Sequence, residues 1–259
     1  MKLNKLLNNR INANIVNSMI TEYDIKAAHT TALYYIKGPE IYEKLMSMPK
    51  LERNIHIGKM IKEDRNLRKQ IDEMIISWFN EFLEENKIIE INFLATTPDS
   101  ILIKNQLAVK TKFGEAKNVL IRNKENISYS SLFVVDKLHF ILYDNMSKRL
   151  RIKGLGVEEV ANKYPFVNGP MRDLCGILDG YMTTNRIEFL KRLKMFRRTY
   201  LNSSNIEIFR SVNDKNMFKY IVDDSIELVD VPIKESENVK LVKTDNYMNY
   251  ILPLIQSFI

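Results

Sequence analysis

Two aspartates, Asp24 and Asp99, stand where a carboxylate side chain could hold a metal ion. Asp99 lies in the turn-forming run Thr97-Pro98-Asp99-Ser100, between two runs rich in Ile, Leu and Phe, and Asp24 follows Tyr23 near the end of a short strand-like run. Two divalent cations about 3.5–4 Å apart can bridge an attacking hydroxyl and a triphosphate, and this chemistry needs at least two carboxylates. Oxygen ligands of this kind suit Mg²⁺ or Mn²⁺. The two residues therefore predict a two-metal site for phosphoryl transfer, provided that the fold brings them together.

Both aspartates also have ordinary structural explanations. Asp is common in hairpin turns, because its side chain bonds nearby backbone groups. Asp24 is equally suited to cap the N-terminus of a helix that begins just after it. The local sequence leaves both alternatives open.

The predicted elements around these residues are strands joined by helices. Residues 88–104 predict strand, tight turn and strand, because Pro98 pre-sets φ and Asp99 suits the bend. Residues 34–48 predict a helix that ends at Pro49. Residues 50–86 carry apolar side chains at a period of three to four, which predicts one long amphipathic helix or a pair of helices.

The remaining elements are predicted from shorter patterns. Residues 1–20 predict a short docking helix, and residues 107–131 predict irregular strands and loops. Residues 132–153 predict a second hairpin that turns at residues 144–146. The Gly-Leu-Gly run at residues 154–156 predicts a hinge and therefore a domain boundary.

After this boundary the chain is predicted to be mainly helical. Residues 164–170 predict a loop, and residues 247–259 predict a mostly buried closing helix. Residues 184–201 predict an amphipathic helix that combines an apolar stripe with the densest positive charge of the chain: Arg186, Lys191, Arg192, Lys194, Arg197 and Arg198. Such a helix favours contact with phosphates over a membrane-surface role, because its apolar residues are ordinary core formers.

Composition narrows the class of protein. The formal charge is +7 and 45% of residues are hydrophobic, which is typical of a globular protein with an anionic partner such as nucleic acid. Cys175 is the single cysteine, which excludes internal disulfides and suits a reducing compartment. No signal peptide and no membrane-length apolar run is found, so we expect a cytoplasmic protein without a membrane partner, in the host cytoplasm if it is viral.

The order of these elements resembles the palm and thumb of a family B DNA polymerase. Tyr23–His29 is similar to the first palm motif of that family, residues 50–58 keep the Lys, Asn and Gly spacing of its fingers helix, and Thr97–Ser100 resembles its Asp-Thr-Asp-Ser turn. Further along, residues 137–140 are similar to the motif that holds the primer. Lys153-Gly154 resembles the pair before the thumb, and residues 245–253 resemble the closing helix.

The resemblance implies an α+β fold in which residues 1–153 form a palm-like domain with reduced fingers at about 34–58, and residues 154–259 form a thumb-like domain. It implies a template-directed nucleotidyltransferase of DNA replication, or a subunit of a split viral polymerase, whose partners are primer-template, nucleoside triphosphate and other polymerase subunits. It assigns Asp24 and Asp99 to catalysis and metal binding, Lys50, Asn54 and His29 to the nucleotide, and Lys137 and Lys153 to the nucleic acid. Lys191, Arg192, Arg197 and Arg198 of the basic helix are expected to bind nucleic acid as well.

The sequence departs from the polymerase pattern at several of these positions. Thr97 replaces the first Asp of the turn, His29 replaces an aromatic that guards the sugar, and no exonuclease domain precedes the palm. A second hypothesis is therefore a catalytically inactive palm and thumb that binds nucleic acid or a partner protein. A third, a reverse-transcriptase-like palm, is less favoured because the paired Asp of that family's second motif is missing.

Overall fold

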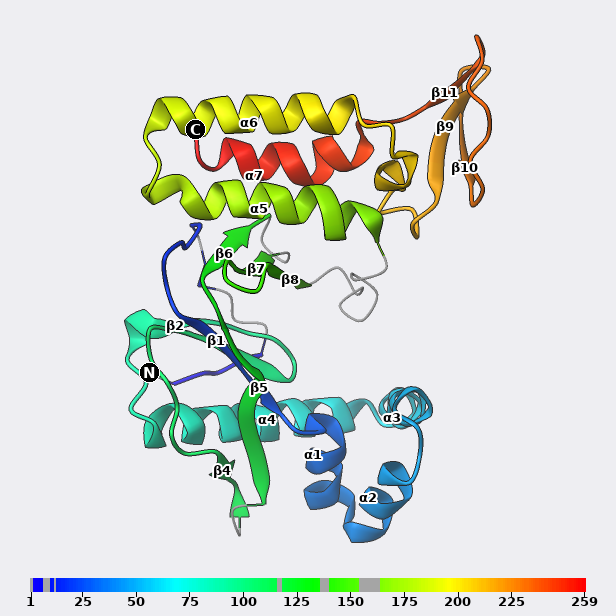
Figure 1. The fold of residues 1–259 in the computed structure, drawn as a ribbon. Coiled ribbons are helices and arrows are strands. Elements are labelled where there is room, and N and C mark those ends of the chain that lie inside the picture. The colour runs from blue at the N-terminus through cyan, green and yellow to red at the C-terminus, as the bar shows by residue number, and fades with distance from the viewer. Residues whose placement is uncertain (1, 7–9, 12, 116–117, 136–139, 154–163) are drawn as a thin grey trace. The chain divides into compact units, whose positions relative to one another are not determined.

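The computed structural model describes residues 2–6, 10–11, 13–115, 118–135, 140–153 and 164–259, without the side chains of residues 124–127 and 153. The chain folds as an α+β protein with antiparallel sheets, which confirms the predicted class (Figure 1). It divides into two compact units. Unit 1 comprises Met1–Ile11 and Met19–Ser128, and unit 2 comprises Asn12–Ser18 and Tyr129–Ile259.

Unit 1 contains a five-stranded sheet in which the spatial order β2-β3-β1-β5-β4 differs from the chain order. Strand β3 pairs antiparallel with both β1 and β2, and β4 pairs antiparallel with β5. The first strand of the chain is therefore enclosed by strands that come much later. The strands are β1 (Ile20–Ile25), β2 (Phe93–Thr96), β3 (Ser100–Lys104), β4 (Lys112–Phe113) and β5 (Val119–Tyr129).

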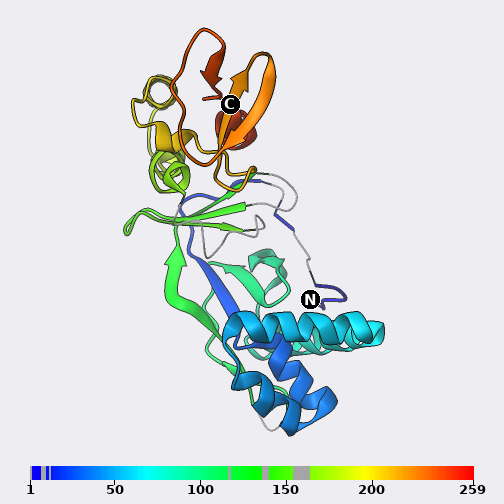
Figure 2. The same cartoon turned by 90° about the vertical axis from the view of Figure 1, so that its right-hand side faces the viewer.

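The helices of unit 1 lie on one side of this sheet (Figure 2). Tyr23 and Ile25 of β1 are buried in the same core as Phe79 and Phe82, and the Tyr23 and Phe82 ring centroids are 5.2 Å apart. Alternate residues of the strands and the residues on one face of the helices thus form a single apolar layer between sheet and helices. The helices are α1 (Ala28–Lys37), α2 (Pro39–Met46), α3 (Lys50–Glu63) and α4 (Arg65–Glu85).

Two predicted helical regions are each divided by a local signal. The region 34–48 is interrupted at Gly38, whose φ of 94° is accessible to glycine, and α2 then starts with Pro39. The region 50–86 is a pair of helices, because the Asp64 side chain accepts hydrogen bonds from the backbone N–H groups of Asn66 and Leu67 and so caps α4.

Unit 2 combines two small sheets with a layer of helices. Phe133, Ile141 and Tyr143 of the sheet β6-β7-β8 share one core with Leu193 of α6 and Leu254 of α7. The elements are β6 (Ser131–Val134), β7 (Phe140–Asp144), β8 (Arg149–Lys153), a π-helical turn (Val167–Met171), α5 (Arg172–Asp179), α6 (Arg186–Leu201), β9 (Phe218–Val222), β10 (Ser225–Val229), β11 (Val239–Leu241), a second π-helical turn (Tyr247–Ile251) and α7 (Leu252–Gln256). Short 3-10 helices occupy Glu90–Asn92 in unit 1 and Gly180–Met182 and Ile206–Phe209 in unit 2.

Several predicted elements are confirmed. The hairpin at 88–104 is β2 and β3, the turn at residues 144–146 joins β7 to β8, and the basic helix is α6. The closing segment is helical over residues 247–256, and its buried residues are Tyr247, Tyr250, Ile251, Leu254 and Ile255. Cys175 is fully buried in the core of unit 2, so it is a packing residue.

The predicted helix at residues 1–20 is wrong for the described part of that segment. The Asn80 side chain holds the backbone of Leu3, accepting from its N–H at 2.6 Å and donating to its carbonyl at 3.0 Å. Ile15 forms a β-bridge with Leu132. The loosely helical spacing of apolar residues is thus outweighed by pairing with distant elements, which satisfies the backbone without a helix.

The predicted loop at residues 164–170 is also wrong, because the chain is helical from Pro165 onward. Val167–Met171 is π-helical and leads directly into α5, with Pro170 inside the turn. Proline argues against a regular helix interior because it has no N–H to donate, and Pro170 lies in a π-helical turn, where the regular i→i−4 hydrogen-bond pattern is interrupted.

The division into units differs from the predicted boundary between residues 153 and 154. It falls between Ser128 and Tyr129, because the β6-β7-β8 sheet packs its apolar face into the core of unit 2. Residues 154–156, the predicted hinge, lie outside the described residues.

Candidate functional site

Asp24 and Asp99 lie at the same end of the unit 1 sheet. Asp24 is the penultimate residue of β1 and pairs with Ser100, the first residue of β3. The N–H of Ile25 donates to the carbonyl oxygen of Asp99 at 2.9 Å. The backbones of the two aspartates are therefore diagonal neighbours in one antiparallel ladder, although a run of four helices separates them in the chain.

The two side chains are held differently. Residues directly opposite in a ladder share a face of the sheet, so Asp24 shares the face of Ser100. Asp99 belongs to the turn, where the hydroxyl of Thr97 donates to its Oδ1 at 3.1 Å and lies 2.7 Å from the hydroxyl of Ser100. Both aspartates are partly buried. The turn therefore positions the Asp99 carboxylate, and strand pairing positions the backbone of Asp24.

Asp99 lies within electrostatic reach of His29 in the first turn of α1. Burial lowers the pKa of His29, and the positive charge of Arg68 lowers it further, while the negative charges of Asp99 and Asp72 raise it by a smaller amount. A histidine in these surroundings favours its neutral form, which can donate from one ring nitrogen and accept at the other. The structure therefore brings together two of the predicted site residues, His29 and Asp99.

Sequence reasoning missed the pair Arg68 and Asp72 on α4. Arg68 Nε donates to Asp72 Oδ2 at 2.9 Å, and Asp72 Oδ1 is buried without a hydrogen-bond partner. An unpartnered carboxylate oxygen is an acceptor that a hydrogen-bond donor or a cation could complete. The i,i+4 spacing of Arg and Asp was the signal in the sequence, but the same spacing is common on solvated helix faces.

Glu22 was also missed. It precedes Asp24 by two residues in β1, so strand alternation puts it on the same face, and it is buried. Burying a carboxylate is costly, and Glu22 places a second acid on the face of the sheet that carries Asp24. The signal was the alternation Glu-Tyr-Asp, in which the middle residue enters the core.

These acids do not form a closed metal cage. Among the described residues, no three His, Cys, Asp or Glu side chains are arranged to hold a metal ion. Mg²⁺ is commonly bound by one or two carboxylates, with waters and substrate phosphates completing its coordination. Asp24 and Asp99 are the predicted ligands of such an open site, and their binding of a metal stays a prediction.

Lys50 and Asn54, predicted to meet the nucleotide, lie on α3. They are one helical turn apart, so they share a face of this helix, and both are exposed. Their helix is distinct from β1, the β2-β3 hairpin and α1, which carry Asp24, Asp99 and His29. Their role at the nucleotide stays a prediction.

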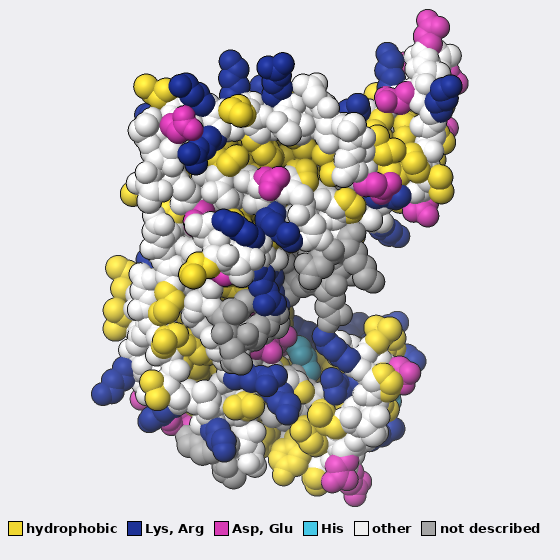
Figure 3. Space-filling view, in the orientation of Figure 1, with side chains coloured by type: hydrophobic (Ala, Val, Ile, Leu, Met, Phe, Trp, Pro, Cys, Tyr) yellow, Lys and Arg dark blue, Asp and Glu magenta, His cyan; other side chains and the backbone are white. Residues whose placement is uncertain are grey.

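The predicted nucleic-acid contacts divide between two regions of unit 2. Lys137 lies outside the described residues, and Lys153 ends β8 opposite Phe140, with its side chain not described. The others are exposed on α6, where the opposite helix face, with Phe189 and Leu193, is buried. Figure 3 shows Lys and Arg side chains along this helix. These exposed α6 residues are Lys191, Arg192, Arg197 and Arg198.

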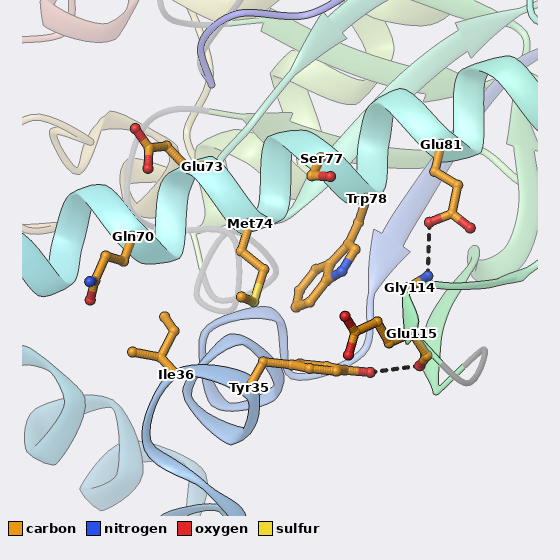
Figure 4. Close-up of a pocket in the computed structure, with 10 residues that line it drawn as sticks. All are labelled: Tyr35, Ile36, Gln70, Glu73, Met74, Ser77, Trp78, Glu81, Gly114 and Glu115. Carbon is orange, nitrogen blue, oxygen red and sulfur yellow. Dashed lines mark hydrogen bonds between the residues drawn. The ribbon is translucent and has the colours of Figure 1, made fainter.

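A pocket of about 790 Å³ lies where α1, α4 and the end of β4 meet (Figure 4). Tyr35 and Trp78 form an aromatic wall, and Glu73, Glu81 and Glu115 surround it. Burial raises the pKa of Tyr35, and the nearby Tyr34, Glu115 and Glu81 raise it further. The negative charge of this pocket repels phosphate, so the triphosphate is not expected here.

Gly114 determines the shape of this pocket. Its φ is 75°, and a Cβ on this residue would lie 2.8 Å from Val119 Cγ2 and 3.1 Å from Trp78 Nε1. Its N–H donates to Glu81 Oε2 at 2.9 Å (Figure 4). Only glycine allows the backbone to approach Trp78 this closely.

Within the described residues, no helix has the length and apolar character that crossing a bilayer requires. No curated protein matches the chain. The family model of the bacteriophage PBS1 gene 130 protein matches residues 2–259, nearly the whole sequence, and the chain therefore belongs to this phage protein family.

Proposed function

We propose that this phage protein is a template-directed nucleotidyltransferase of the DNA polymerase type, or the palm-and-thumb subunit of a split polymerase. In this proposal unit 1 supplies the palm with reduced fingers. The β6-β7-β8 sheet and the helices of unit 2 supply the primer grip and the thumb.

The observation that carries this proposal is the register of β1 against β3. The pairing of Asp24 with Ser100 and the hydrogen bond from Ile25 N–H to the Asp99 carbonyl put two acids from distant segments at one sheet end. Asp24 and Asp99 would hold Mg²⁺ or Mn²⁺, which would neutralise charge on the triphosphate and on the attacking hydroxyl. Strand ends suit this role because burial of the strands fixes the carboxylates before substrate binds.

The other predicted residues would act on the substrate directly. Lys50 offers a compact positive charge to the triphosphate, and Asn54 offers amide hydrogen bonds to the nucleotide. His29, neutral because of its burial, would contact the sugar or base near Asp99. Lys137, Lys153 and the basic face of α6 would contact the backbone of the primer-template.

Primer extension in the presence of Mg²⁺ tests this proposal. We expect Asp24→Asn and Asp99→Asn each to reduce nucleotide incorporation by about a hundredfold or more, since each removes a ligand charge while keeping side-chain size. Glu73→Gln is the matched control, because Glu73 is an exposed acid on α4 of the same unit, and its incorporation rate should equal that of the wild type. Thermal unfolding followed by circular dichroism verifies that all three variants fold.

A second candidate is a catalytically inactive palm and thumb that binds primer-template. It is favoured by Thr97, which stands in the place of an acid and donates its hydroxyl to Asp99 Oδ1. If no incorporation is seen with Mg²⁺ or Mn²⁺, and binding of a labelled primer-template is equal in the wild type and both aspartate variants, the second candidate replaces the first.

A further inference from the structure

The small sheet β10-β9-β11 of unit 2 has two faces of different character. On one face Phe218 and Tyr220 are buried in the core of the unit, and Val222 and Val229 pack against it. Strand alternation assigns the neighbouring residues to the other face, where Ile221 of β9 lies directly opposite Ile226 of β10. That second face carries the apolar Ile221, Ile226 and Leu228 together with Lys219 and Lys240, and it is not covered by the unit's core.

Large apolar side chains gather on and beside this outer face. Ile226 is 67% exposed, Leu228 is 43% exposed and Ile221 is 42% exposed. Just after β10, Val231 and Ile233 are exposed too. Single exposed apolar residues are common, but several within one short hairpin region are typical of an interaction surface.

Strand β10 is an edge strand. It pairs with β9 on one side, and in the part of the chain that the structure describes no strand lies on its other side. The turn between the strands is Asp223-Asp224, and both residues have positive φ, as two-residue hairpins of this type require. The turn fixes the register, so the free edge of β10 is presented as a preformed template for another strand.

The charge around this edge is opposite to that of the whole chain. The segment 223–237 carries six carboxylates and one lysine, whereas the chain has a formal charge of +7. Asp230 pairs with Arg210 at 3.4 Å, and Glu235 accepts from the N–H of Leu241 at 3.0 Å. Figure 3 shows hydrophobic and acidic side chains, together with Lys or Arg side chains, on the arm that this sheet forms in Figure 1. The other acids of the segment, all exposed, are Asp223, Asp224, Glu227 and Glu237.

We propose that the β10 edge, together with the acidic side chains of residues 223–237 (the acidic rim), is a docking site for a partner protein. This partner would present an extended apolar segment flanked by Lys or Arg. The acidic rim would repel nucleic acid and anionic membranes, which have the same sign of charge. A second copy of the same arm would set carboxylates against carboxylates, which disfavours self-pairing. A strand with apolar and cationic side chains would hydrogen-bond to the free edge, cover the apolar residues and pair with the carboxylates of the acidic rim. This inference does not depend on nucleotidyl transfer.

A synthetic decapeptide that alternates Lys and Val is a suitable probe, with a decapeptide that alternates Glu and Val as its counterpart. We expect the full chain to bind the labelled Lys-Val peptide saturably in fluorescence anisotropy and to leave the Glu-Val peptide unbound. Ile226→Ser combined with Leu228→Ser should weaken binding by about tenfold or more. Ile91→Ser combined with Val109→Ser is the matched control, because these residues are 74% and 87% exposed in unit 1, and it should bind as the wild type does.

The acidic rim is tested by Asp223→Asn combined with Asp224→Asn. Asparagine accepts positive φ, so the turn is kept, while two charges are removed. We expect weaker peptide binding with a shallower dependence on salt. Hydrogen exchange of the complex should show protection of the β10 amides.

Three results would overturn the proposal. One is equal affinity of the Lys-Val peptide for the wild type and the Ile226, Leu228 variant. Another is protection confined to a different part of the chain, such as the acidic pocket of unit 1. The third is a dimer in light scattering that the same two substitutions abolish, which would make a second copy the occupant.

Discussion

Unit 1 and unit 2 arrange their charged residues in different ways. In unit 1, Asp24 and Asp99 become neighbours only through the pairing of β1 with β3, across a run of four helices. In unit 2, four of the cations that are expected to bind phosphate lie along one helix, α6, and the acids of the proposed docking site lie along one hairpin and the loop that follows it. A site made by long-range register depends on the stability of the whole sheet, whereas a surface made by one element depends on that element and its packing.

The sharpest test of this contrast is a cavity in each core. Phe82→Ala in unit 1 and Phe218→Ala in unit 2 each remove a fully buried ring, which should cost about 3–5 kcal/mol of unfolding free energy. We expect Phe82→Ala to disturb the Asp24 and Asp99 register, because this ring packs on Tyr23 and Phe113. Urea unfolding and hydrogen exchange measure the two effects.

Hydrogen exchange would break the comparison if Phe82→Ala and Phe218→Ala deprotected the same amides. It would sharpen the comparison if Phe82→Ala deprotected β1 and β3 while the β9 and β10 amides kept their protection.

The next effect concerns the basic face of α6. Neutralising four of its residues to Gln should lower primer-template affinity by about tenfold or more and reduce the log-log salt slope by about 0.9 for each phosphate that is no longer neutralised. The four residues are Lys191, Arg192, Arg197 and Arg198. The control removes equal charge elsewhere, through Gln at the exposed residues Lys44, Lys59, Lys215 and Lys234. Anisotropy across a salt series measures both sets, and an equal slope in the two would remove α6 from the interface.

A smaller loss of unfolding free energy is expected when a buried carboxylate of unit 2, Asp179, is removed. Asp179 accepts hydrogen bonds from the hydroxyls of Ser130 and Ser131 and lies at the C-terminal end of α5. Asp179→Ala leaves these hydroxyls without this acceptor and should cost about 1–3 kcal/mol in urea unfolding. Asp173→Ala, an exposed acid on the same helix, should cost much less. Equal losses for the two would show that these hydrogen bonds contribute little.

The smallest effect is a pH dependence that differs between the units. Burial lowers the folded-state pKa of His29 below its usual 6.5, so the unfolded chain binds more protons between the two values. Unit 1 should therefore lose stability as pH falls below about 6.5, and His29→Gln should remove this part of the dependence. Unfolding of the wild type and His29→Gln at a series of pH values tests this, and parallel curves would contradict it.

The stability of unit 2 should depend on pH in a lower range, below the usual pKa of an aspartate. Hydrogen bonding from Ser211 lowers the pKa of Asp214 below its usual 3.8, with a further contribution from Lys219. The stability that depends on the Asp214 carboxylate is present above that value and is lost as pH falls through the lowered pKa. Asp214→Asn should flatten the acid limb of unfolding in unit 2, measured by the same denaturation series, and leave the dependence near pH 6.5 unchanged.

Patterns local to the chain were sufficient for several elements. Hairpin β2-β3 follows from Pro98 and Asp99 between apolar runs, and α6 follows from its apolar period. At the N-terminal segment the prediction failed because a distant group replaced local ones: the Asn80 side chain held the backbone of Leu3. At residues 164–170 it failed because a π-helical turn contains Pro170, a residue that indicates a loop. The residues that were missed at the candidate site, Arg68 and Asp72, look like any solvated pair until α4 is placed beside α1.

The amino-acid sequence by itself determined the α+β class, the turn that presents Asp99 and the cationic face of α6. Each of these follows from side chains that lie two to four residues apart in the chain. Only the tertiary structure decided that β1 lies between β3 and β5, that Glu22 shares a face with Asp24, and that β10 is left at an edge. The physical reason is that strand pairing joins backbone groups irrespective of their distance in the chain, and burial of one face then selects a single register.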